Sequence, residues 1–296
     1  MTLFCLFNAD DFALNREASS AITMLVENRR LQATSILAGG EDQLSYDSLK
    51  KAGNIFINVH LNLLEGKALT DGGDRFGITT NEGFFCLTLG QLILKLYLSI
   101  DKTALMDWIF NEFCQQIEFV YSRFEDYEIR LDGHLHIHTL PPLKKVIERL
   151  LKKYPVRYIR VPSELKYVQK TDLVGKIKGK LRRQLLASWS RGLNDLVRHY
   201  HVNTANFFLG IEASCKLTLY DLDKGLEKIS SNLRGQNATV EIMTHPVNEG
   251  TPHWEFYKDS KYSSAHSTLE RKNEMRLLMS DELFDVMKKH DAVFLK

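Results

Sequence analysis

The fold is decided by the stretch Leu3-Phe4-Cys5-Leu6-Phe7-Asn8-Ala9-Asp10-Asp11-Phe12, in which an apolar, β-prone run ends in two adjacent carboxylates. Residues 3–8 predict a first strand. Apolar residues between Ala18 and Val26 then recur at helical spacing, which predicts a helix over that strand. Short apolar runs alternate with longer amphipathic runs over nearly the whole chain. This alternation is typical of a parallel sheet wrapped by helices.

The remaining elements follow the same alternation. Two helices are expected between residues 89 and 124, and Pro141-Pro142 predicts the start of another. Further strands are expected at residues 34–37, 55–63, 129–138, 156–161, 206–211, 240–244 and 292–295. This βα order favours a (β/α) barrel, complete, distorted or incomplete, formed by one domain over residues 1–296. An open doubly wound sheet stays an alternative, and both architectures place sites at the carboxyl ends of strands.

Composition and charge exclude several classes of protein. Hydrophobic residues make up 44 % of the chain and charged residues 26 %, the ordinary balance of a globular protein with a full core. The net charge of +2 creates no long-range field that would attract nucleic acid or membrane. The four cysteines form no CxxC pair, the first residues do not resemble a signal peptide, and no apolar run reaches the ~20 residues that cross a bilayer. We expect a soluble, cytoplasmic protein.

Three islands of carboxylates and histidines follow expected strands: Asp10-Asp11, His60 within Asn58–Asn62, and the block Asp132–His138. In that block His134, His136 and His138 alternate with apolar residues, which predicts that they share one side of an extended strand. At ~3.3 Å per residue the first and last would lie roughly 13 Å apart, so one ion would take only one or two of them. Its remaining ligands would come from His60 and the aspartate pair.

A further histidine, His245, follows another expected strand and could donate a proton to a leaving group. Each feature alone has a structural explanation, since an Asp-Asp pair can cap a helix and alternating histidines can line a solvated strand. Their coincidence at strand ends favours one hydrolytic metal site. Nucleophilic catalysis by Ser214 or Cys215 is weakly supported, because no glycine elbow or obvious base accompanies them.

These motifs resemble the YdjC-like carbohydrate deacetylases, which include enzymes that remove acetyl groups from chitooligosaccharides. That family opens with Asn-Ala-Asp-Asp-Phe-Gly, and this chain departs from it at Ala13, where strain is expected if the position needs a positive φ. The matching segments are Asn8 to Phe12, Asn58 to Gly66, Asp132 to His138, Arg160 to Glu164, and Met243 to Pro246.

The resemblance implies roles for individual residues. Asp11, His60 and His134 would hold a divalent metal, usually Mg²⁺ in the family, although two imidazoles and one carboxylate suit Zn²⁺ or Fe²⁺ at least as well. Asp10 would be the general base and His245 the acid or oxyanion partner. The groups expected to support the site or contact substrate are His136, His138, Arg160 and Trp254, the last of which could stack on a sugar face or simply pack.

The expected activity is removal of an acetyl group from an N-acetylated sugar or short oligosaccharide by metal-activated water. A metal-dependent phosphoesterase or amidohydrolase on the same fold, or an inactive sugar-binding homologue, stays an alternative. The family resemblance also suggests a homodimer. The basic segment 176–183 is expected to be a solvated face, because no glycine-rich phosphate cradle precedes it.

Overall fold

The structure is a computed structural model that describes residues 1–125, 127–167, 173–233, 235–248 and 268–295. Its eight strands are β1 (Leu3–Phe12), β2 (Ala33–Ile36), β3 (Phe56–Leu61), β4 (Arg130–Gly133), β5 (Tyr158–Ile159), β6 (Phe207–Leu209), β7 (Ala238–Thr244) and β8 (Ala292–Phe294). Every pair of neighbouring strands is parallel. The predicted βα order is therefore confirmed, with strand ends displaced by a few residues.

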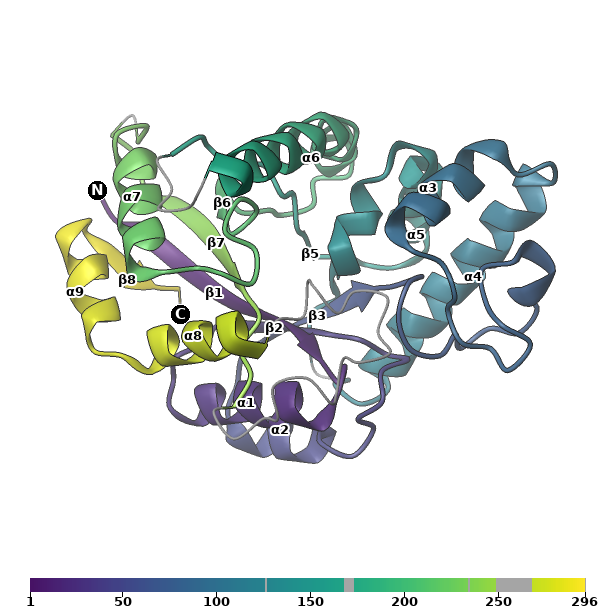
Figure 1. Ribbon diagram of the computed structural model, residues 1–296, viewed down its shortest axis with the longest axis horizontal. Helices are drawn as coiled ribbons and strands as arrows, with labels where there is room; N and C mark the ends of the chain where they lie inside the picture. Colours follow the sequence, from purple (N-terminus) through teal and green to yellow (C-terminus); the bar gives the residue numbers. More distant parts are fainter. Residues whose placement is uncertain (126, 168–172, 234, 249–267, 296) are drawn as a thin grey trace.

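Helices surround this sheet on its outer side (Figure 1). They are α1 (Arg16–Glu27), α2 (Tyr46–Ala52), α3 (Leu89–Leu98), α4 (Lys102–Tyr121), α5 (Lys144–Lys153), α6 (Leu173–His199), α7 (Leu219–Ser230), α8 (Thr268–Met279) and α9 (Glu282–Lys289), with short 3₁₀ turns η1 (Asp74–Phe76), η2 (His134–Thr139) and η3 (Pro141–Leu143). The Asn15 side chain accepts a hydrogen bond from the Ala18 amide and so caps α1. The apolar stripe of α1 is buried against the sheet, as its periodicity predicted.

The strand β1 lies inside the sheet and pairs with three other strands, β2, β7 and β8. The strand order is β5-β4-β3-β2-β1-β7-β6, and β8 pairs with the beginning of β1. Apart from Phe4, every residue of β1 is buried. Because all these strands are parallel, the carboxyl ends of β1, β3, β4 and β7 lie at the same end of the sheet.

The sheet is a curled half-barrel, and a full (β/α)₈ barrel is not confirmed. Within the described ranges, only two isolated bridges, Tyr158 to Asn203 and Glu164 to Phe208, link the region of β5 to the region of β6. The edge strands have two and three residues, too few for a continuous ladder. The Glu164 carboxylate instead accepts hydrogen bonds from the Gly210 and Glu212 amides, so a side chain satisfies donors that a longer strand would have paired.

The prediction of one extended strand through the histidine block is wrong. The strand β4 ends at Gly133, and the chain turns at once into η2, where Leu135 and His136 have φ of 48° and 59°. Alternating side-chain type cannot signal such a turn, because left-handed backbone is uncommon outside glycine. The three histidines therefore diverge instead of sharing one face.

No helix in the described part of the chain is both long and apolar enough to span a bilayer. All four cysteines, Cys5, Cys86, Cys114 and Cys215, are free thiols.

Candidate metal and catalytic site

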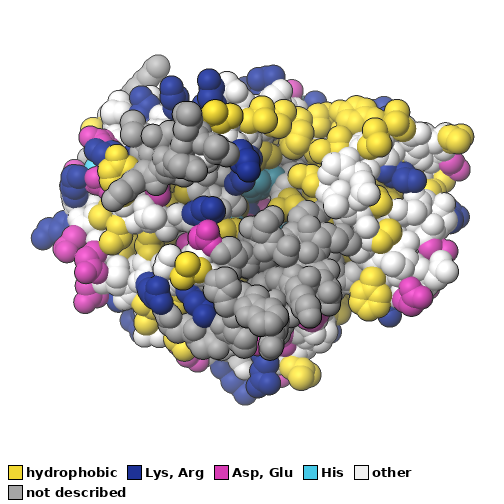
Figure 2. All heavy atoms as spheres, in the orientation of Figure 1, with side chains coloured by type: hydrophobic (Ala, Val, Ile, Leu, Met, Phe, Trp, Pro, Cys, Tyr) yellow, Lys and Arg dark blue, Asp and Glu magenta, His cyan; other side chains and the backbone are white. Residues whose placement is uncertain are grey.

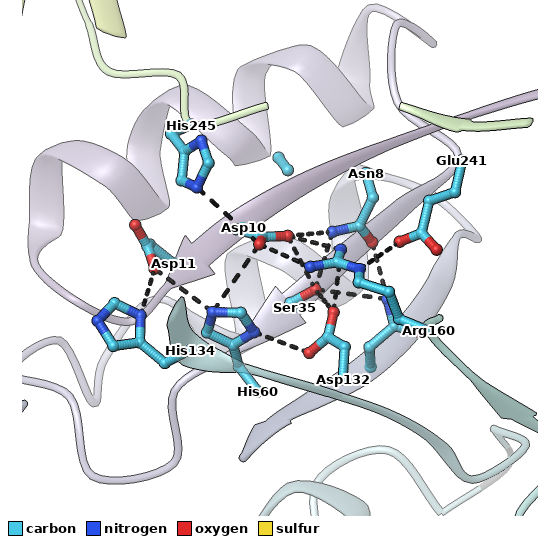
Figure 3. Close-up of polar contacts among 12 residues, drawn as sticks. Asn8, Asp10, Asp11, Ser35, His60, Asp132, His134, Arg160, Glu241 and His245 are labelled. Atoms are coloured by element: carbon cyan, nitrogen blue, oxygen red, sulfur yellow. Dashed lines mark hydrogen bonds and ion pairs between the residues drawn. The ribbon is translucent and has the colours of Figure 1, made fainter. Parts of the chain in front are cut away.

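The two adjacent aspartates reach the same site because β1 is irregular at its carboxyl end. The pairing of β1 with β2 shifts register between Ala9 and Phe12, and Asp11 has a φ of 71°. In a regular strand neighbouring side chains point to opposite faces, and a bulge re-aims one of them. As a result His60 Nε2 lies 3.9 Å from Asp10 Oδ2 and 3.6 Å from Asp11 Oδ1 (Figure 3).

Three of the predicted site residues, Asp11, His60 and His134, form a compact set of donor atoms. One ligand atom from each lies within 4.8 Å of the others, and all three side chains are buried. His134 Nδ1 lies 3.2 Å from Asp11 Oδ1, on the side where His60 Nε2 also points (Figure 3). Two imidazoles and a carboxylate are suitable ligands for Zn²⁺ or Fe²⁺, and the carboxylate also suits Mg²⁺. The residues therefore fit a divalent cation.

The orientation of His60 is set by Asp132, the first residue of the Asp132–His138 block, for which the sequence predicted no role of its own. His60 Nδ1 donates to Asp132 Oδ1 at 2.7 Å, which leaves Nε2 facing the aspartates. Ligand histidines in metalloproteins are commonly held in this way by a carboxylate on the other ring nitrogen. Burial lowers the pKa of His60, but Asp132 and Asp10 outweigh burial and the pKa is raised overall.

The carboxylate of Asp11 is shared with a second residue that the sequence did not reveal. Arg271, on α8, donates to Asp11 Oδ2 at 2.7 Å, while Asp11 Oδ1 is the oxygen that faces the two histidines. Burial would raise the pKa of Asp11, but Arg271 and His134 hold it well below its ordinary value. Arg271 thus keeps Asp11 ionised and leaves Asp11 Oδ1 facing His60 and His134.

Asp10 is held by a bidentate pair with Arg160. The two terminal nitrogens of Arg160 donate to the two Asp10 oxygens at 2.7 and 2.8 Å, and its Nε donates to Glu241 Oε1 at 2.7 Å. Arg160 Nη2 also lies 3.0 Å from Asp132 Oδ2. The pKa of Asp10, which burial alone would raise, is held well below its usual range by Arg160 and His60. Arg160 therefore holds Asp10 from the interior of the sheet, and its role in the reaction stays a prediction.

His245 lies on the opposite side of Asp10 from that clamp. Its Nε2 is 4.0 Å from Asp10 Oδ2, at the carboxyl end of β7 (Figure 3). Burial lowers the pKa of His245 to about 4, although Asp11 and Asp10 act in the other direction. The imidazole is therefore neutral near pH 7.

The two remaining histidines of the block face away from the donor set. His136 packs against Phe208, with ring centroids 5.9 Å apart, and His138 Nε2 donates to the Arg160 carbonyl at 2.9 Å. The hydrogen bond of His138 restrains the backbone of Arg160. A contact of His136 with substrate stays a prediction, and Trp254 lies outside the described residues.

The basic segment 176–183 belongs to α6, and it is only partly a solvated face. Lys178 and Lys180 are exposed. Arg182 donates to the Ile211 carbonyl and Arg183 pairs with Glu212, so these two arginines bind the segment that follows β6.

On the face of the molecule that Figure 2 shows, histidine atoms are visible at the floor of a hollow.

Comparison with known proteins decides the family. The model of the YdjC-like protein family matches residues 5–289. The chain belongs to the YdjC-like family. Ala13, at the position where the family motif has glycine, has a φ of 70°, in the left-handed region that costs a residue with a Cβ roughly 1–2 kcal/mol. The turn is held by the Ala13 amide, which donates to Ser19 Oγ, and by the Asp42 amide, which donates to the Ala13 carbonyl.

Several curated proteins with similar sequences are named carbohydrate deacetylases. A carbohydrate deacetylase from Xenopus laevis is 22 % identical over 257 residues, covering 82 % of this chain and 80 % of the relative. One from Mus musculus is 28 % identical over 257 residues, with 82 % and 78 % covered. One from Halalkalibacterium halodurans is 31 % identical over 153 residues, with 51 % and 61 % covered.

A solved structure shares the fold of this YdjC-like chain. The crystal structure of a putative cellobiose-phosphate cleavage protein from Enterococcus faecalis superposes with a TM-score of 0.68 at 16 % identity. The match covers 100 % of this chain and 98 % of that protein. The curled parallel sheet is therefore also the architecture of that protein.

Proposed function

We propose that this YdjC-like protein is a metal-dependent deacetylase that releases acetate from N-acetylated sugars or short oligosaccharides. The observation that carries the proposal is the convergence of Asp11, His60 and His134 beside Asp10 and His245. The names of its relatives, which are carbohydrate deacetylases, support the substrate class. A divalent cation held by the three donors would lower the pKa of a water molecule and polarise the acetyl carbonyl.

The chain's own residues supply the proton path. Hydrolysis forms a C–O bond and breaks the C–N bond, so one proton must move from water to the departing nitrogen. Asp10 is ionised and positioned by Arg160, which allows it to accept that proton. Neutral His245, 4.0 Å from Asp10, can receive the proton and deliver it to the amine. The products are acetate and a free amino sugar.

The site favours one cation over two, and so favours deacetylation over a two-metal phosphoesterase. A second group that could hold a metal, Asp10, His60 and Asp132, shares His60 with the first. Both of its carboxylates are already paired with the Arg160 guanidinium, at 2.7 and 3.0 Å. A second cation would have to displace an arginine that is fully buried.

The test measures free acetate. The protein is stripped with a chelator, reloaded separately with Mg²⁺, Mn²⁺ or Zn²⁺, and incubated with N-acetylglucosamine and its short oligomers. Acetate release is expected only with metal, and is lost in His134→Ala but not in the matched control His199→Ala, an exposed histidine on α6. Binding of these sugars without acetate release under all metals would instead select the inactive homologue. Unchanged turnover in His134→Ala would remove His134 from the mechanism.

A further inference from the structure

The helix α8 delivers a second buried side chain to the site, one turn after Arg271. Glu274 is 1 % exposed and lies between two segments that follow strands. Its Oε2 accepts from the His245 amide at 2.6 Å, and its Oε1 accepts from the Leu217 amide at 2.9 Å. The same Oε2 lies 3.9 Å from His245 Nδ1. One carboxylate therefore fixes His245 both to α8 and to the segment beyond β6.

We propose that Glu274 is a positioning residue, which holds the His245 imidazole beside Asp10, with its Nε2 4.0 Å from Asp10 Oδ2. The inference rests on the proposed function, since it assumes that His245 moves a proton. The His245 backbone follows the last residue of β7, so the sheet alone does not fix the direction of its side chain. The amide-to-carboxylate bond at 2.6 Å supplies that restraint. Arg271 and Glu274 on one helix then hold Asp11 and His245 together.

The chain contains a matched control in Glu164. This carboxylate is also buried and also accepts from two backbone amides, those of Gly210 and Glu212, at 2.7 and 2.8 Å. Burial raises the pKa of both glutamates to about 7, despite those hydrogen bonds. Glu164→Met and Glu274→Met thus orphan two amides each and remove a similar group. Only the second variant releases His245.

The experiment is a double-mutant cycle on acetate release with saturating metal. We expect Glu274→Met to lower kcat about tenfold through the freed His245, with the dissociation constant of Zn²⁺ and KM unchanged. In the His245→Ala background, Glu274→Met should cost less than twofold more, whereas Glu164→Met should keep its own full effect. Additive losses for Glu274→Met and His245→Ala would overturn the inference. Glu274→Gln, which keeps one acceptor oxygen, serves as a milder variant if the methionine variant is poorly folded.

A second readout does not depend on activity. Hydrogen exchange of the His245 backbone amide, followed by NMR, should become about tenfold faster in Glu274→Met than in Glu164→Met, because only the first removes its acceptor. Equal exchange in the two variants would contradict a positioning role. If wild-type protein released no acetate, the proposed function would fail while this measurement would still decide whether Glu274 holds His245.

Discussion

Replacing Asp132 with Asn tests how the metal site is held together. Asp132 is completely buried, orients His60 through the 2.7 Å bond to Nδ1 and also lies 3.0 Å from Arg160 Nη2. An amide has one acceptor oxygen. If that oxygen faces His60, the amide nitrogen opposes Arg160; if it faces Arg160, the nitrogen opposes His60 Nδ1 and favours a proton on Nε2. Either arrangement weakens His60 as a ligand.

The expected loss in metal affinity is ten- to a hundredfold, which corresponds to roughly 1.4–2.7 kcal/mol. Isothermal titration calorimetry of the stripped protein with Zn²⁺ and Mn²⁺ measures it directly. Acetate release should fall in parallel at limiting metal and recover largely at saturating metal, since Asp132 acts through His60. Glu112→Gln is the control, because Glu112 is also buried but accepts hydrogen bonds from the Leu69 and Thr70 amides and contacts none of the proposed metal-binding residues. Wild-type affinity in Asp132→Asn would refute the reasoning.

Three further substitutions test the contacts of Arg160, the role of Asp10 and the effect of buried His138 on stability. Arg160→Lys should lower acetate release at least about a hundredfold with metal affinity retained, because an ammonium cannot bind both Asp10 oxygens and Glu241 at once; a wild-type rate would contradict the clamp. Asp10→Asn should lower the rate about 10²–10⁴-fold while calorimetry still shows metal binding, and loss of binding would make Asp10 a ligand. Burial lowers the pKa of His138 from 6.5 to about 4, so its contribution to stability is present above pH 6.5 and is lost as the pH falls toward 4. Between pH 6.5 and pH 4 the wild-type protein should lose up to about 3 kcal/mol more unfolding free energy than His138→Gln, which thermal melts at several pH values would measure. The same pH dependence of the unfolding free energy in both proteins would refute this.

The sequence predicted the elements whose signals are local. The apolar run before Asp10 and the periodic stripe of the following helix determined β1 and α1, and the carboxyl ends of parallel strands brought Asp11, His60 and His134 together as expected. The curled sheet was predicted only in outline, because strands as short as β5 and β6 leave almost no pattern.

What the sequence could not predict depends on contacts between distant segments. Arg271 lies 260 residues beyond Asp11, on a helix with no distinguishing motif, and Glu274 reaches His245 from that same helix. The turn after Gly133 was missed because alternating histidines and apolar residues also fit an extended strand. The sequence offers only one signal for such residues, an arginine or glutamate on the face of a helix that is expected to be buried. That signal does not identify the residue that the side chain contacts.

The proposed activity requires one cation held by three side chains from three strand ends. A crystal grown with Zn²⁺ or Mn²⁺ and measured at the absorption edge of that metal tests this directly. We predict a single anomalous peak at ~2.0–2.3 Å from Asp11 Oδ1 and from one ring nitrogen each of His60 and His134. A peak bound elsewhere, or none at a saturating metal concentration, would contradict it.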